Sequence, residues 1–77
     1  IGRDRFVRNC LIAAGNSGDA KLLPIIATLL HDGSPLVRAM AVWSHRQLAE
    51  LQEHHDLRET LMQHEHDDAV RREWQAR

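Results

Sequence analysis

Apolar residues recur along the chain with the spacing of helices that bury one face. Val7, Leu11 and Ala14 stand at positions i, i+4 and i+7, and Val37 with Ala41 repeats the start of that spacing. No segment alternates between apolar and polar residues over the length of a strand, and β-branched residues are few. The pattern therefore predicts an all-α chain.

We expect about five helices, packed as consecutive antiparallel hairpins. Three of the expected starts carry a side chain that can accept a hydrogen bond from the first turn, namely Asp4, Ser34 and Asp67. Asp56 with Glu59 has the spacing of a capping box and indicates a fourth start. The expected helices lie near residues 5–14, 20–31, 35–52, 57–64 and 68–76.

Two segments are expected to interrupt helical order. The run from Gly15 to Asp19 is rich in turn-forming residues and offers a glycine for a left-handed helix terminus, with Asp19 as the next cap. Pro24 lies about one turn inside the second predicted helix, where its missing N–H should bend or delay that helix.

One dipeptide marks three of the helix starts. Val7-Arg8, Val37-Arg38 and Val70-Arg71 lie 30 and 33 residues apart, and each follows its capping residue by three positions. Self-similarity at this period is typical of stacked helical hairpins, which bury a continuous core only when neighbours stack. We therefore expect an α-α superhelix of short repeats.

The residues that carry this repeat resemble a known class. The run 7–19, with Leu22-Leu23-Pro24 and then 32–38, is similar to HEAT-like repeats of about 30 residues. The stretch 3–48, with Trp43 in the second Val-Arg helix, resembles the C-terminal region of tRNA epoxyqueuosine reductase. The chain departs from that family's pattern at residues 44–47, where Ser-His-Arg-Gln replaces a tendency toward leucine and glycine.

The resemblance implies a function for the parent protein. In that family, an upstream cobalamin-binding domain and an iron–sulfur domain reduce epoxyqueuosine to queuosine in tRNA, and the helical repeats assist tRNA binding. The resemblance thus implies that residues 1–77 are one non-catalytic C-terminal domain, whose partners are tRNA and the upstream domains. We expect no cofactor within it. The alternative is a scaffold for protein interaction or packing with no RNA role.

Size and composition agree with a fragment of a larger protein. The 77 residues suffice for one small domain, and Ile1 opens a first Val-Arg helix that lacks the preceding helix of its hairpin. Cys10 is the single cysteine, so no intrachain disulfide forms, which fits a reducing compartment. No apolar run has the length of a membrane-spanning helix. We expect a cytoplasmic protein without membrane contact.

The charges divide unevenly along the chain. Residues 1–38 hold five basic and three acidic side chains, whereas residues 39–77 hold five and eight, for a net charge of −1. In a stacked array, equivalent basic positions form ridges that can contact tRNA phosphates. The candidate RNA-binding residues are Arg5, Arg8, Lys21, Arg38 and Arg46. In the alternative interpretation these arginines form intramolecular ion pairs, for example Arg38 with Asp32.

The six histidines raise the question of a metal site. His54 and His55 with His64 and His66 match neither an HExxH motif nor paired Cys/His spacing, so we expect solvated histidines at helix ends and no metal. An acid–base set of His55 with nearby carboxylates is likewise not expected, because no pocket-forming loop or activated nucleophile accompanies it.

The two tryptophans and Cys10 are expected to pack. Trp43 and Trp74 fall on or beside predicted apolar faces, which favours packing between repeats over stacking on unpaired bases. Trp74 is expected to bury its ring against the helix that holds Leu57 and Leu61. Cys10 occupies the position that Met40 holds in the next unit, which indicates a small core residue.

Overall fold

Five α-helices make up most of the chain. The computed structural model describes residues 2–77, and within this range there is no strand. The helices are α1 (Gly2–Ser17), α2 (Leu23–Leu29), α3 (Pro35–Leu48), α4 (Leu51–Leu61) and α5 (Asp68–Gln75), with 3-10 turns at Ala20–Leu22 and Met62–His64. The expected all-α fold is confirmed.

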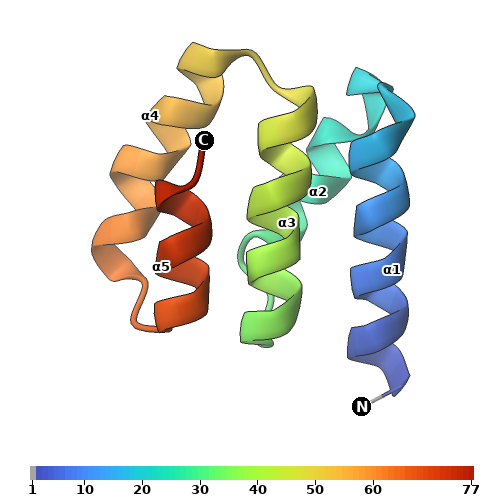
Figure 1. Cartoon of the computed structure of the whole chain (residues 1–77), viewed down its shortest axis with the longest axis horizontal. Helices are drawn as coiled ribbons and strands as arrows, with labels where there is room; N and C mark the ends of the chain where they lie inside the picture. Colours follow the sequence, from blue (N-terminus) through green and yellow to red (C-terminus); the bar gives the residue numbers. More distant parts are fainter. Residues whose placement is uncertain (1) are drawn as a thin grey trace.

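The three Val-Arg helices run side by side in one direction. Figure 1 shows α1, α3 and α5 ascending in a row, while α2 and α4 return in the opposite direction. The helix α3 lies at the centre and packs against α1, α2 and α5. Each returning helix joins two ascending ones, so the chain is an array of antiparallel hairpins, and the residues of the Val-Arg motif occupy equivalent places in it.

The core lies where α3 meets its neighbours. Val37 and Ala41 of α3 are fully buried, and Leu11 of α1 is 2% exposed. The remaining buried apolar side chains come from α2, α3 and α5 and the residue after α2: Ile26, Leu30, Val42, Val70 and Trp74. These positions repeat the i, i+4 spacing of the sequence, so the helical periodicity correctly identified the buried faces.

The helices α1 and α3 approach each other closely at Gly15. A Cβ atom at this position would clash with Cζ3 of Trp43 and would lie 3.2 Å from the Cα of Ser44. The hydroxyl of Ser44 donates a hydrogen bond to the carbonyl of Leu11 across the same contact. Glycine is therefore required here because the Trp43 ring covers its backbone, and the expected packing of Trp43 between repeats is confirmed.

The first helix is longer at both ends than the sequence predicted. It begins at Gly2, so Asp4 lies within the first turn instead of capping it, and its carboxylate accepts from Arg3 at 2.9 Å. The helix also continues through Gly15 because the contact with Trp43 holds that residue in helical order. The left-handed residue is Gly18, with φ of 71°. Asp19 caps the following turn as expected, through Lys21 N at 3.0 Å.

Pro24 delays α2, as the sequence indicated. The predicted helix 20–31 is divided into a 3-10 turn and an α-helix that begins at Leu23, which places Pro24 in the first turn. There the absent N–H has no intrahelical acceptor to lose. Ser34 and Asp67 cap α3 and α5 as predicted, each accepting from the backbone N–H three residues later.

The boundary between α3 and α4 differs most from the prediction. The helix α3 ends at Leu48 and α4 begins at Leu51, after two extended residues. The predicted capping box is wrong, because Asp56 lies inside α4, where it accepts from Gln52 at 2.9 Å. No glycine marks this break. Its position follows from tertiary packing, since an earlier start of α4 places His54 in the interior.

Candidate functional site

The arginine of the Val-Arg motif holds the loop that precedes its helix. Nη1 of Arg38 donates to the carbonyl of Asp32 at 2.9 Å. Nη1 of Arg71, in the next unit, donates to the carbonyl of Glu65 at 3.1 Å. Asp32 and Glu65 are equivalent positions, 33 residues apart like Arg38 and Arg71. The recurring dipeptide therefore has a structural role in α3 and α5: valine enters the core and arginine fixes the loop.

The acidic residues of these two loops are also equivalent. Asp32 accepts from the backbone N–H of Ser34, and Glu65 accepts from that of Asp67, both at 3.0 Å. Arg3 of α1 donates to both carboxylate oxygens of Asp32, at 2.6 and 3.0 Å. The predicted pairing of Arg38 with the Asp32 carboxylate is thus corrected, because Arg3 occupies that carboxylate.

Arg38 instead binds Glu65, in the loop before α5. Its Nε and Nη2 donate to the two carboxylate oxygens at 3.0 and 2.9 Å, and the Glu65 side chain is 10% exposed. Burial opposes ionisation of Glu65, but the hydrogen bonds from Arg38 and Asp67 outweigh it and lower the pKa. Asp32 has its pKa lowered to about 2, chiefly by Arg3. Both loops are therefore held by charge-assisted bonds.

The five candidate RNA-binding residues fall into separate places. Arg5 and Arg8 are exposed on α1 and line one shallow hollow together with Asn9 and Leu36. Lys21 is exposed in the turn after α1. Within residues 2–77, none of these three side chains has an ion pair. Arg38 is half-buried in its contacts with Glu65, and Arg46 lines a different cavity.

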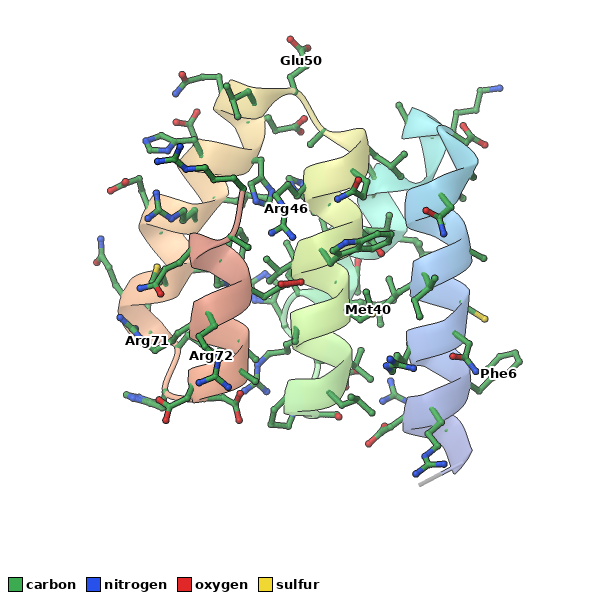
Figure 2. The ribbon with its side chains drawn as sticks, viewed as in Figure 1. Phe6, Met40, Arg46, Glu50, Arg71 and Arg72 are labelled. Carbon is green, nitrogen blue, oxygen red and sulfur yellow. The ribbon has the colours of Figure 1, made fainter. Side chains whose placement is uncertain are left out.

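Arg46 joins α3 to the end of α5. Its Nη1 donates to the carbonyl of Glu73 at 2.7 Å, and its Nη2 lies 3.5 Å from the Glu73 carboxylate. Figure 2 shows Arg46 in the space between α3 and the α4–α5 pair. It lines a cavity of about 550 Å³ there, with Arg58 and Trp74. Sequence reasoning identified Arg46 but missed Arg58, which only the tertiary fold brings near it.

His54, which the sequence indicated as solvated, is buried beside this cavity together with His45. His45 and His54 are 1% and 6% exposed, and their Nδ1 atoms lie 2.8 Å apart, so one neutral ring donates to the other. The His54 ring also lies against Trp74, at 5.2 Å between centroids. His55, His64 and His66 are exposed, as expected. One signal was available for His45, because it falls four residues after Ala41 on the buried face of α3.

Burial keeps both histidines neutral. It lowers the pKa of His45, against an opposing effect of Glu53. It also lowers the pKa of His54 to about 4, with further contributions from His45, Arg46, Arg58 and His55. Because protonation of these two buried histidines disfavours the folded state, the free energy of unfolding depends on pH.

We expect stability to fall as the pH drops from about 6.5 toward about 4. The pKa of His54 is lower in the folded state than in the unfolded state, so the unfolded state binds more protons between these two pH values. The stabilisation that comes from keeping His54 neutral is therefore complete above pH 6.5 and is lost as the pH falls. The loss from His54 is about 3 kcal/mol. Urea unfolding at several pH values measures it. His64→Gln, at an exposed histidine, is the control, and a flat profile between pH 6.5 and 4 contradicts the assignment.

Trp74 is buried and Cys10 is not. Trp74 is 3% exposed and contacts α4, which carries Leu57 and Leu61, so its expected packing is confirmed. The prediction for Cys10 is wrong, since this residue is exposed. Met40, its equivalent, lies on the side of α3 that faces α1, whereas the corresponding side of α1 faces away from α3 (Figure 2).

Neither a metal cluster nor a membrane-crossing helix is found in the described part of the chain. No three His, Cys, Asp or Glu side chains of residues 2–77 gather in a way that could hold a metal ion. No helix among these residues combines the length and apolar character needed to cross a membrane.

No protein-family model matches the chain, and neither the curated proteins nor the solved structures contain a match.

Proposed function

We propose that this chain is a non-catalytic HEAT-like module of a tRNA-modifying epoxyqueuosine reductase, which stacks on a further helical repeat and assists tRNA binding. The resemblance of residues 3–48 to the C-terminal region of that reductase supports the choice of the parent protein. In this proposal, the parent's cobalamin and iron–sulfur domains carry out the reaction. The observation that carries the proposal is helix α1, which has an uncovered apolar stripe on the side away from α3 and, beside Leu36 of α3, two arginines with no acidic partner in residues 2–77.

The apolar stripe is explained by the repeat. On α3, Met40 lies on the side that faces α1 (Figure 2), and Trp43 covers Gly15 of α1. Leu36 of α3 lines a shallow hollow with residues of α1. The equivalent residues of α1, thirty positions earlier, are Phe6, Cys10 and Ala13. All three are exposed, Phe6 by 69%. The occupant that fits this side is another ascending helix, packed on α1 as α1 packs on α3.

Arg8 fits the same arrangement. Its equivalents Arg38 and Arg71 each hold the loop before their helix. Arg8 has no such loop within residues 2–77, and its side chain is exposed. In a stacked array, Arg8 binds the carbonyls of the loop from the neighbouring repeat. Arg5 and Lys21 are then the candidate cations that remain for tRNA phosphates.

The tRNA contact is tested by its salt dependence. Phosphate contacts release counterions, so we expect the chain to bind tRNA with a dissociation constant of about 10⁻⁴–10⁻⁶ M that rises steeply with salt. Arg5→Ala with Lys21→Ala should weaken binding and reduce the slope by about one for each lost contact. Fluorescence anisotropy against salt concentration measures both quantities.

Arg72→Ala is the matched control for this test. Arg72 is exposed on α5 and has no ion pair among the described residues, so its removal deletes one positive charge, against two in the double variant, in a different place. An equal loss for each charge removed in the control and the double variant indicates a general charge effect and contradicts a site formed by Arg5 and Lys21. Circular dichroism of each variant verifies that it remains folded.

A scaffold with no RNA role is the second candidate, and the apolar stripe of Phe6, Cys10 and Ala13 favours it independently of any charge. It predicts no salt-dependent tRNA binding for the chain. The anisotropy experiment therefore separates the two functions.

A further inference from the structure

The cavity between α3, α4 and α5 has an unusual concentration of positive charge. Three arginines and two histidines line it, and no aspartate or glutamate of residues 2–77 does. The charged and titratable residues of the lining are Arg46, Arg58, Arg77, His54 and His55. The chain as a whole has a net charge of −1, so the positive charge around this cavity is a local feature, and it favours an anion there.

Three buried side-chain nitrogen atoms have no partner among residues 2–77, and each belongs to a residue that lines this cavity. They are Nε of Arg46, Nε of Arg58 and Nε2 of His54. A buried polar atom without a hydrogen bond costs about 1–3 kcal/mol, so three in one cavity indicate a missing partner. Arginine N–H groups donate and never accept. The missing partner must therefore carry acceptor oxygens.

The helix ends around the cavity act in opposite directions. The amino end of α4 borders it through Leu51, and the Glu50 side chain does not cap that helix, so the α4 dipole favours an anion. The carboxyl end of α5 disfavours one, but Arg46 donates to the Glu73 carbonyl and offsets it. Two acids contact the charged and titratable residues of this lining: the Glu73 carboxylate lies 3.5 Å from Nη2 of Arg46, and the Glu59 carboxylate lies 3.5 Å from Nε2 of His55.

We propose that this cavity binds a phosphate group, with Arg46, Arg58 and His54 as its donors. Phosphate offers several acceptor oxygens to donors that arrive from different helices, and its negative charge makes the hydrogen bonds from arginine charge-assisted, which a cation or a neutral ligand cannot do. The volume of about 550 Å³ exceeds the needs of one phosphate, and Trp74 and Leu51 provide apolar walls, so a phosphate ester fits better than the free ion. This site does not depend on α1 and stands or falls separately from the proposed function.

Nuclear magnetic resonance titration of the chain with inorganic phosphate tests the site. At constant ionic strength, adjusted with sodium chloride, we expect saturable shifts of the Arg46 and Arg58 Nε–H and His54 ring signals. We also expect the measured pKa of His54 to rise by about one unit, because a bound anion stabilises its protonated form. Signals that stay unchanged relative to chloride overturn the proposal.

Two variants locate the binding. Arg58→Gln should weaken phosphate binding at least tenfold, while Arg72→Gln, on the exposed side of α5, should leave it unchanged. If Arg58→Gln does not fold, Arg58→Lys retains the charge but loses the Nε–H donor, and binding is expected to weaken several-fold. Unchanged binding in a folded Arg58 variant contradicts the assignment, whatever phosphate does to the wild type.

Two further probes distinguish the source of the phosphate. Adenosine monophosphate that binds more tightly than inorganic phosphate identifies a small phosphate ester as the ligand. A single-stranded RNA oligonucleotide without a terminal phosphate that produces the same shifts identifies the nucleic-acid backbone. Weaker binding of both probes than of inorganic phosphate contradicts the ester assignment.

Discussion

Replacing Trp74 with alanine is expected to lower the free energy of unfolding by about 3–5 kcal/mol. The ring is 3% exposed and lies against His54 of α4, so its removal leaves a cavity where α5 meets the rest of the array. A domain of this size has a total stability of about 4–12 kcal/mol. The variant should therefore be either largely unfolded or folded with little remaining stability. Urea unfolding followed by circular dichroism measures this.

Two companion variants separate packing from a general effect of mutation in α5. Trp74→Phe retains most of the apolar volume and is expected to cost about half as much or less. Gln75→Ala changes an exposed neighbour and should stay within about 0.5 kcal/mol of the wild type. A Trp74→Ala chain that unfolds at the wild-type urea concentration contradicts the role of this residue as the anchor of α5.

Replacing Arg38 with alanine is expected to cost about 3 kcal/mol, far more than the same change at Arg8. Arg38 donates two hydrogen bonds to Glu65 and two to the carbonyls of Asp32 and Gly33. Its removal leaves a largely buried carboxylate without its cation, which is the costly way to break such a pair. Urea unfolding of the two variants measures the difference.

Arg8→Ala is the internal control, because Arg8 holds the same motif position but is exposed and has no ion pair in the described residues. It should stay within about 0.5 kcal/mol of the wild type. Arg38→Lys is expected to recover little, since an ammonium cannot reproduce the planar fork that binds Glu65 and the loop together. Equal effects of Arg8→Ala and Arg38→Ala contradict the assignment of Arg38 as the clamp of the two loops.

These roles change how the candidate RNA-binding set is tested. A double variant of Arg8 and Arg38 combines an exposed residue with one that stabilises the fold, so its loss of tRNA binding can follow from unfolding. Arg5 and Lys21 are exposed and lie outside those contacts. They therefore give the cleaner measurement of phosphate contact.

The features that the sequence determined by itself depend on residues close together in the chain. Ser34 and Asp67 cap their helices because each needs only the backbone N–H three residues away. The periodicity of Val37 and Ala41 identified the buried face of α3, since a helix alone decides which residues share a side. The repeat of about 30 residues predicted the hairpin array for the same reason, since α3 and α5 each carry their own start signal.

The partner of each charged or titratable side chain was decided only by the tertiary structure. Glu65 lies 27 residues from Arg38, and the arginine that binds Asp32 comes from 29 residues away. Cys10 is exposed because α1 presents that side away from α3. His54 is buried because α4 begins before the predicted capping box and turns its ring between α3 and α5. Local spacing predicts which face a residue occupies, but only the packing of helices determines what covers that face, and therefore which donors of the cavity are left without a partner.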